Sequence, residues 1–296
     1  MTTALERLDQ LPSVTQIIRQ HGLTADRRLG QHFLHDPAIL NRIVAAAGPL
    51  AGRTVVEIGP GPGGLTRALL AAQPRLLVAV ERDPRCIEAL TSLEGVAGST
   101  LKLVQADALT VELAEHAAPP WTIVANLPYN IATELLFRWL NRPRDLATIV
   151  VMIQKEVAQR ITAQPGTKDY GRLAIMIQWL CEATRCFDVP AGAFLPPPKV
   201  TSTVIRLVPR SKTLFDAPAP MLRRLLAAVF GHRRKMLRSS LAAVTADPKG
   251  VLERANISPE ARPETLSIEA FCRLATVLTK DVDQRRNCST NENNPG

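Results

Sequence analysis

The sequence has 296 residues, 46% of them hydrophobic, with a formal net charge of +9 and a pI of about 9.8. This length suits one large domain or two unequal ones, and the excess of lysine and arginine favours a polyanionic partner because these side chains release counterions from phosphates. No apolar run approaches the ~18 residues of a membrane span and the first residues lack a signal-peptide pattern, so we expect a cytoplasmic protein without a membrane partner.

The first half of the chain alternates predicted strands and helices. Asp36 and Pro37 predict the N-cap and first residue of a helix that Gly48 closes. Short, continuously apolar strands separated by helices are typical of a parallel sheet covered on both faces. The predicted strands are 54–58, 76–80, 101–105, 122–126 and 147–153, and the helices between them are 65–72, one capped by Asp83, and 131–140.

The pattern changes after a helix predicted over 174–183. Two further strands are predicted over 184–189 and 201–208, and the second alternates as a half-exposed antiparallel strand does. Beyond Pro209 the sequence is helical with charged faces, up to a last helix capped by Ser267. We therefore predict a domain over 1–209, a small all-helical domain over 210–280, and a disordered tail over 281–296.

A glycine-rich loop follows the first predicted strand. Gly59 and Gly61 begin a G-x-G-x-x-G spacing that opens a helix, and Glu81 ends the second strand where a ribose-binding acid is expected. Pro60 and Pro62 remove backbone N–H donors that a pyrophosphate needs, which favours S-adenosylmethionine because its sulfonium end carries no phosphate. A nicotinamide or flavin cofactor, or a purely structural turn, stays open on these residues alone.

Polar groups also follow the third and fourth strands. Asp107 suits an adenine amino group, or it caps the next helix. In ANLPYN (125–130), the Asn126 side-chain oxygen and the Leu127 carbonyl can accept both hydrogens of an adenine N6 amine, which leaves its lone pair free to attack a methyl group without a strong base. Tyr129 would stack on the base. A proline-containing turn with a half-buried tyrosine is the alternative.

With these motifs in place, the sequence resembles the rRNA adenine dimethyltransferase family over about residues 28–280. Within that family it is similar to the bacterial enzymes that dimethylate the N6 amines of two adjacent adenosines in the 3′-terminal hairpin loop of small-subunit (16S) rRNA. The resembling motifs are LGQHFL (29–34), VEIGPGPGGLT (56–66), VERD (80–83), QADAL (105–109), NLPYN (126–130), QKEVAQRI (154–161), YGRL (170–173), FLPPPKV (194–200) and HRRKMLRSSL (232–241).

This resemblance implies an α/β, Rossmann-like methyltransferase sheet over 1–209 that binds S-adenosylmethionine, followed by a basic helical rRNA-binding domain over 210–280. It also implies three sets of functional residues. The donor-binding set is His32, Leu34, Gly59, Gly61, Glu81, Asp107 and Asn126. The catalytic set around the target base is Asn126, Leu127, Tyr129 and Phe194. The rRNA-binding set is Arg233, Arg234, Lys235 and Arg238. The family more often has asparagine where this sequence has His32.

The predicted activity is therefore that of an S-adenosylmethionine-dependent rRNA (adenine-N6,N6)-dimethyltransferase with a role in small-subunit biogenesis. No metal is expected, because the five cysteines form no CxxC pair and have no histidine at ligand spacing. The basic excess is concentrated late in the chain, with eleven Lys/Arg against three Asp/Glu from Arg206 to Arg254. We expect a monomer whose partner is small-subunit rRNA within a ribosomal subunit or an assembly intermediate.

Three alternatives remain at this point. A related family of large-subunit rRNA dimethylases shares much of the chemistry, although the FLPPPKV and HRRKMLRSSL segments argue against it. The chain could instead act chiefly as a ribosome assembly or nucleic-acid-binding factor. A dehydrogenase is the most distant alternative, since it depends on the glycine loop alone.

Overall fold

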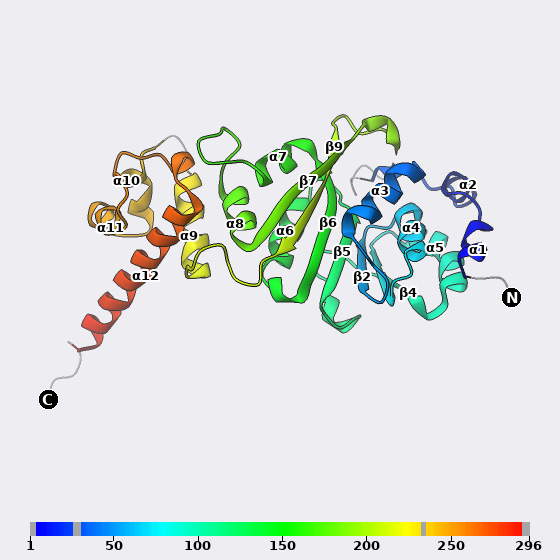
Figure 1. Ribbon diagram of the computed structural model, residues 1–296, viewed down its shortest axis with the longest axis horizontal. Helices are drawn as coiled ribbons and strands as arrows, with labels where there is room; N and C mark the ends of the chain where they lie inside the picture. Colours follow the sequence, from blue (N-terminus) through cyan, green and yellow to red (C-terminus); the bar gives the residue numbers. More distant parts are fainter. Residues whose placement is uncertain (1–3, 26–30, 232–234, 292–296) are drawn as a thin grey trace. The chain divides into compact units, whose positions relative to one another are not determined.

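The computed structural model describes residues 4–25, 31–231 and 235–291 (Figure 1). The chain divides into two compact units. One comprises the residues up to Ala158 together with Glu182–Ser211, and the other comprises Gln159–Cys181 together with the residues from Lys212 onward. The second unit therefore includes a segment from the middle of the chain that the predicted division at residue 209 assigned to the first domain.

The first unit is built on a seven-stranded sheet with the order β4-β3-β2-β5-β6-β9-β7. β2 pairs in parallel with β3 and with β5, β3 with β4 and β5 with β6, whereas β9 runs antiparallel to β6. This mixed sheet confirms the predicted α/β class. The strands are β2 (Thr54–Ile58), β3 (Leu76–Glu81), β4 (Leu101–Gln105), β5 (Trp121–Asn126), β6 (Leu146–Gln154), β7 (Cys181–Val189) and β9 (Ser202–Pro209).

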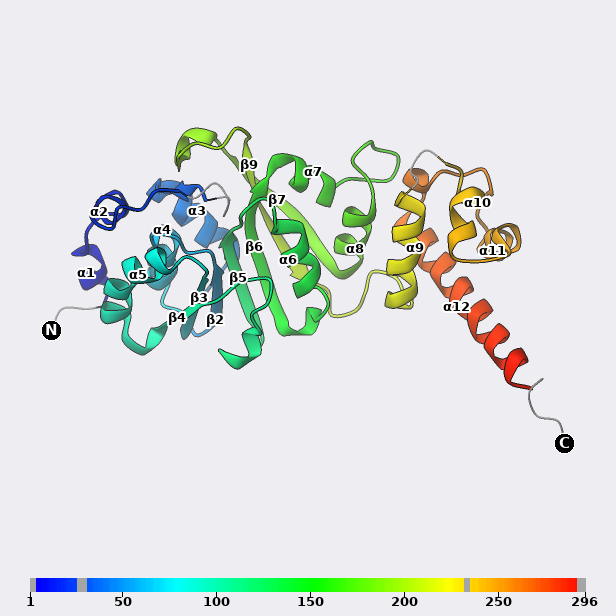
Figure 2. The same cartoon turned by 180° about the vertical axis from the view of Figure 1, so that it is seen from behind.

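Helices cover both faces of this sheet. α3 lies over one face, where it contacts β5, β6 and β9, and the view from behind brings α6 in front of the sheet (Figures 1 and 2). Two helices begin where the sequence predicts. The Asp36 carboxylate accepts hydrogen bonds from Ala38 and Ile39 N–H at the start of α3, and Asp83 accepts one from Arg85 N–H at the start of α5. The helices of this unit after residue 36 are α3 (Pro37–Ala47), α4 (Gly64–Ala71), α5 (Pro84–Ala97) and α6 (Ala132–Trp139); α7 (Lys155–Ile161) spans the division between the units.

The N-terminal segment is more structured than its sequence predicts. α1 (Ala4–Asp9) and α2 (Val14–Gln20) precede the first predicted helix, and α2 begins at a capping box in which Ser13 and Gln16 exchange hydrogen bonds. A second, two-stranded sheet joins β1 (Phe33–Leu34) to β8 (Phe194–Leu195). Strands of two residues carry no periodicity, so this pairing could not be predicted from sequence.

The second unit is helical. α8 (Arg172–Leu180) ends earlier than predicted, because the chain turns extended at Cys181 and enters β7. α9 (Ala219–Gly231) packs on α8 and on α12 (Ile268–Asn291), where the Phe230 and Phe271 rings lie 5.8 Å apart. Ser267 caps α12 through Ala270 N–H, as predicted. The remaining helices are α10 (Leu237–Ser240) and α11 (Pro248–Arg254).

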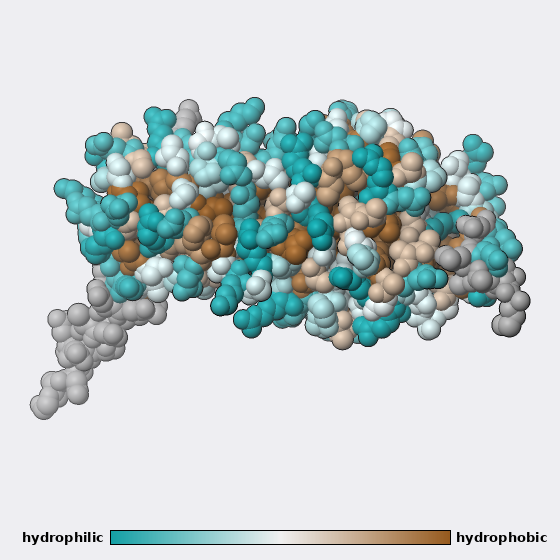
Figure 3. Space-filling view, in the orientation of Figure 1, coloured by the Kyte–Doolittle hydropathy of each residue, from teal (hydrophilic) through white to brown (hydrophobic). Residues whose placement is uncertain are grey.

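α12 continues to Asn291, within the segment 281–296 for which the sequence predicts a disordered tail, and residues 292–296 lie outside the described residues. None of the helices in the described parts of the chain is long and apolar enough to span a membrane. Hydrophilic side chains cover much of the face drawn in Figure 3, with apolar side chains showing between them. The largest apolar residues are otherwise packed inside the two units.

Candidate active site

A pocket opens in the first unit at the carboxyl ends of the parallel strands. The order of the strands reverses between β2 and β5, and in open α/β sheets ligands bind at such a reversal. The loops after β2, β3, β4 and β5 line the pocket together with residues 31–34. Backbone of the glycine loop, acidic side chains and polar side chains therefore converge on one cavity, as they do in ligand-binding sites.

The glycine loop forms one wall of the pocket. Gly61 has φ +54°, and a Cβ there would lie 3.3 Å from the Phe33 ring. The three glycines of residues 59–63 already donate their N–H groups inside the protein. Gly59 donates to the Val80 carbonyl, Gly61 to the Glu81 carboxylate, and Gly63 to the Pro60 carbonyl. Residues 59–63 thus offer no N–H to a pyrophosphate, which strengthens the argument against a dinucleotide.

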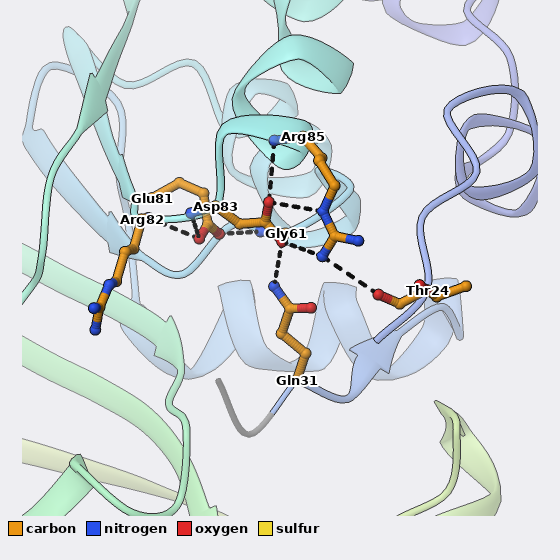
Figure 4. A network of polar contacts seen from close by, with 7 residues as sticks. All are labelled: Thr24, Gln31, Gly61, Glu81, Arg82, Asp83 and Arg85. Carbon is orange, nitrogen blue, oxygen red and sulfur yellow. Dashed lines mark hydrogen bonds and ion pairs between the residues drawn. The ribbon is translucent and has the colours of Figure 1, made fainter. Parts of the chain in front are cut away.

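Glu81 ends β3 with its carboxylate fixed by the backbone (Figure 4). Oε1 accepts hydrogen bonds from the N–H groups of Arg82 (2.8 Å) and Asp83 (2.9 Å), and Oε2 accepts one from Gly61 N–H (3.0 Å). Burial raises the pKa of this carboxyl, although the three backbone donors oppose that rise. Oε2 keeps a second lone pair for a ligand hydroxyl, because each carboxylate oxygen accepts about two hydrogen bonds.

A second acid next to Glu81 ties the N-terminal segment to this wall (Figure 4). Asp83 accepts hydrogen bonds from the Gln31 side chain (3.0 Å) and the Arg85 guanidinium (2.6 Å), and Arg85 also donates to the Thr24 carbonyl. The Arg85 contact is the main reason that the pKa of the Asp83 carboxyl falls to about 2. This network ties Gln31, within the GQHFL motif, to the turn that follows Glu81.

Asp107 lies on the wall that follows β4. Its Oδ1 accepts a hydrogen bond from Leu109 N–H (2.9 Å) and its Oδ2 forms an ion pair with Arg82 (3.2 Å). Asp107 therefore caps a tight turn rather than a helix, and the side chain is still one-third exposed. It lines the pocket, so the sequence alternatives are not exclusive here: the turn orients the carboxylate and a ligand can still reach it.

Asn126 stands opposite these acids, at the end of β5. Its amide nitrogen Nδ2 donates to the His32 carbonyl at 3.0 Å. Since this bond assigns the nitrogen to the protein, the amide oxygen is the end left for an amine in the pocket. Leu127 follows as a buried lining residue whose N–H donates to the Met152 carbonyl.

Tyr129 is held from two sides. Its hydroxyl lies 2.7 Å from the Ser202 hydroxyl, and the His32 ring stacks on it with centroids 5.9 Å apart and planes at 28°. His32 Nδ1 is 2.8 Å from the Pro196 carbonyl oxygen, which can only accept, so Nδ1 carries the hydrogen. Where the family more often has asparagine, this chain thus has a ring that joins the GQHFL and FLPPPKV segments.

The other predicted residues divide into three cases. Leu34 is buried and lines the pocket. Phe194 is only 2% exposed, packs in the core and does not line the pocket, so its predicted contact with a base has no support from this arrangement. Lys235 is exposed just before α10 and Arg238 is exposed within it, whereas Arg233 and Arg234 lie outside the described residues.

Glu57 is a further lining residue, for which the sequence indicates no role. It precedes the glycine loop by two positions, in the order Glu57, Ile58, Gly59. The side chain is 1% exposed and lines the pocket, and neither carboxyl oxygen has a partner at hydrogen-bond geometry. Burial raises its pKa to about 8; the nearby Thr66 hydroxyl opposes this rise and the Glu81 charge adds slightly to it, so the protonated form is favoured. A buried, unpartnered acid beside a ligand cavity is a further candidate for donor binding. Within the described residues, no group of three or more His, Cys, Asp or Glu could hold a metal ion.

The chain is similar to known proteins over most of its length. The model of a family described as ribosomal RNA adenine dimethylase matches residues 22–280. The chain is 49% identical over 270 residues to a ribosomal RNA small subunit methyltransferase A of Rhodospirillum rubrum, covering 91% of this chain and 93% of the relative. It is 48% identical over 268 residues to the protein of the same name in Paramagnetospirillum magneticum, covering 90% and 95%.

Two solved structures extend the likeness to the fold. A dimethyladenosine transferase of Plasmodium falciparum superposes with a TM-score of 0.75 at 26% identity, covering 85% of this chain and 98% of that one. The 23S rRNA methyltransferase ErmE superposes with a TM-score of 0.62 at 29% identity, covering 83% and 99%.

Proposed function

The chain belongs to the ribosomal RNA adenine dimethylase family, and we propose that it transfers methyl groups from S-adenosylmethionine to the N6 amines of two adjacent adenosines in the 3′-terminal hairpin loop of 16S rRNA. The product is N6,N6-dimethyladenosine. The observation that carries this proposal is the orientation of Asn126, whose amide oxygen is left for the pocket because the amide nitrogen is bound to the His32 carbonyl.

The donor side of the pocket suits S-adenosylmethionine. Glu81 Oε2 has a lone pair for a ribose hydroxyl, and Asp107 offers an acceptor to the adenine amine. The backbone from Gly59 to Gly63 can approach the methyl donor closely, and its N–H groups are not needed for a phosphate because S-adenosylmethionine has none. His32 and Leu34 complete the wall from the N-terminal side. When bound, the sulfonium supplies an activated methyl group, so the protein needs to supply position and acceptors.

The target side supplies those acceptors. The Asn126 oxygen and the Leu127 carbonyl would each accept one N6 hydrogen, which favours a pyramidal nitrogen with its lone pair aimed at the methyl group. Tyr129 would hold the adenine ring in line through stacking. A methylated amine retains one hydrogen, so the second transfer needs only one of the two acceptors after the amine rotates.

Small-subunit rRNA is favoured over large-subunit rRNA as the substrate. The relatives at 48–49% identity are named for the small subunit, whereas the structure named for 23S rRNA is 29% identical. Lys235 and Arg238, with Arg233 and Arg234 beside them in the sequence, would bind rRNA phosphates. The protein would act as a monomer in the cytoplasm, on a ribosomal subunit or an assembly intermediate, without a metal.

The test uses small subunits that lack the modification, incubated with methyl-labelled S-adenosylmethionine and then digested to nucleosides. We expect label in N6,N6-dimethyladenosine at two adjacent positions of the 16S rRNA. No label in the adenosines of the small subunits, or label only in the 23S rRNA of large subunits offered in a parallel reaction, would overturn the proposal. To separate catalysis from assembly, Asn126→Ala should abolish labelling; if small-subunit maturation continued normally in that variant, binding rather than methylation would be the main role.

A further inference from the structure

The FLPPPKV segment carries an exposed apolar side chain on a strand that pairs with the pocket wall. Leu195 is 47% exposed, one of four large hydrophobic residues that stand out as exposed in the described part of the chain. It belongs to β8, whose partner β1 contains Phe33, a residue that lines the pocket. Leu195 pairs with Phe33 in that ladder. An exposed leucine is therefore paired, across the two-stranded sheet, with a residue of the pocket wall.

The backbone around Leu195 is held in place. Successive residues of a strand point to opposite faces, so Phe194 packs into the core at 2% exposure while Leu195 faces outward. The next residue, Pro196, accepts the hydrogen bond from His32 Nδ1 at 2.8 Å. Pro197 and Pro198 follow, and each proline fixes its own φ. The leucine is presented on a stiff support, so holding it exposed costs little further ordering.

The surroundings favour a nucleic acid rather than an apolar protein surface. Lys199 is exposed in the same segment, and the chain carries a net charge of +9. The pocket whose wall pairs with the strand of Leu195 is the one proposed to take a base out of an rRNA loop. Proteins that distort nucleic acids insert apolar side chains between bases, where the side chain replaces the stacking partner that has left.

From these observations, which rest on the function proposed above, we propose that Leu195 is a wedge. It enters the rRNA loop as the target adenosine moves into the pocket, and it packs against the neighbouring base that the adenosine leaves behind. Its role is to stabilise the unstacked state of the RNA, so it acts on the substrate before methyl transfer. It touches neither the methyl donor nor the reacting amine.

The test places 2-aminopurine next to the target adenosine in the 16S hairpin RNA and measures its fluorescence on binding the full chain. Fluorescence of this base rises when it loses a stacked neighbour. We expect a clear rise with the wild-type chain, less than half of that rise with Leu195→Ala, and recovery with Leu195→Met, which restores apolar length. Leu214→Ala is the matched control, since Leu214 is 40% exposed in the second unit and should leave the signal unchanged.

The rate of methyl transfer to unmodified small subunits gives the second readout. Leu195→Ala should lower kcat/KM about tenfold, which corresponds to about 1.4 kcal/mol, a part of what unstacking one base step costs. Donor affinity and melting temperature should match the wild type. Equal fluorescence for wild type and Leu195→Ala, or an equal loss with Leu195→Met, would overturn the wedge. A wild-type chain that unstacks the RNA without transferring methyl groups would instead overturn the proposed function and leave the wedge standing.

Discussion

The two acids proposed to bind the methyl donor, Glu81 and Asp107, are held by contacts within one edge of the sheet, whereas the proposed target side is held by contacts between segments far apart in the sequence. Glu81 bonds to the next two residues and to Gly61, 20 positions away, and Asp107 bonds within its own turn and to Arg82. On the other side, Asn126 reaches His32 across 94 positions, Tyr129 reaches Ser202 across 73, and His32 reaches Pro196 across 164.

Because of this difference, substitutions on the two sides should affect different steps of the reaction. The acceptors of the donor side are set by adjacent loops of one sheet edge, so a substitution there should act on donor affinity. On the target side, Asn126 and Tyr129 are each held by a distant segment, so a substitution at either should act on methyl transfer more than on binding of the methyl donor. A comparison of the donor Kd with the single-turnover rate therefore separates the two sides.

The largest effect is expected at Asn126. Asn126→Ala removes an acceptor for the N6 amine and the bond to the His32 carbonyl, so we expect the transfer rate to fall about 100- to 1000-fold, as for loss of one oxyanion-type contact. The Kd for S-adenosylmethionine, measured by calorimetry, should change much less than the transfer rate, although Asn126 is also expected to contact the donor. Asn126→Asp is the matched variant, since it keeps an acceptor and loses the donor to His32. A transfer rate within tenfold of wild type for the alanine variant contradicts the assignment.

Glu57 tests the donor side through stability. Its pKa is raised from the usual 4.5 to about 8 by burial, so folding favours the protonated acid and the free energy of unfolding falls as pH rises from 4.5 to about 8. Glu57→Gln cannot ionise and escapes this loss. Denaturant unfolding should show the variant gaining roughly 3 kcal/mol on the wild type between pH 5 and pH 7, at 1.36 kcal/mol per pH unit. An equal difference at both pH values would show that Glu57 ionises normally.

Glu81 sharpens the donor side by affinity. Glu81→Gln puts an amide where a carboxylate accepts three N–H groups, so at least one backbone N–H must face the amide NH2. We expect the affinity for S-adenosylmethionine to fall between about tenfold and a hundredfold, the value of a hydrogen bond to a charged group. At saturating donor the transfer rate should stay within about threefold of wild type. A fall in the methyl-transfer rate with an unchanged affinity for S-adenosylmethionine would contradict the proposed role of Glu81 in donor binding.

The smallest effect is expected at the Tyr129 hydroxyl. Ser202→Ala and Tyr129→Phe each remove one partner of the same 2.7 Å contact. Each should slow transfer about threefold to tenfold, because one neutral hydrogen bond is worth about 1 kcal/mol. The double variant should be no slower than the slower single variant, since both changes remove one interaction. Additive losses would show that Ser202 and Tyr129 act separately.

Most of the sheet could be predicted from sequence, because its strands are continuous apolar runs between turn signals. The runs at 54–58 and 101–105 match β2 and β4 in full, and the caps at Asp36, Asp83 and Ser267 begin the helices as expected. Strands and helix caps of this kind depend on residues that are neighbours in the sequence. The donor-side acids share this property, since each directly follows or ends a strand.

The target side could not be predicted in the same way. No local pattern shows that β1 will pair with β8, that His32 will stack on Tyr129, or that Ser202 will meet the phenol. The burial of Phe194 likewise depends on its pairing with Leu34. Glu57 carried a signal, an acid inside an otherwise apolar strand, but its lack of a partner is a property of the folded core.

The central claim concerns where the adenine amine sits relative to Asn126. A structure of the full chain with the methyl donor analogue sinefungin and the 16S hairpin RNA measures this directly. The account predicts one target adenine in the pocket, with its N6 about 2.7–3.2 Å from both the Asn126 side-chain oxygen and the Leu127 carbonyl oxygen. An adenine bound elsewhere, or an N6 facing the Asn126 amide nitrogen, would contradict it.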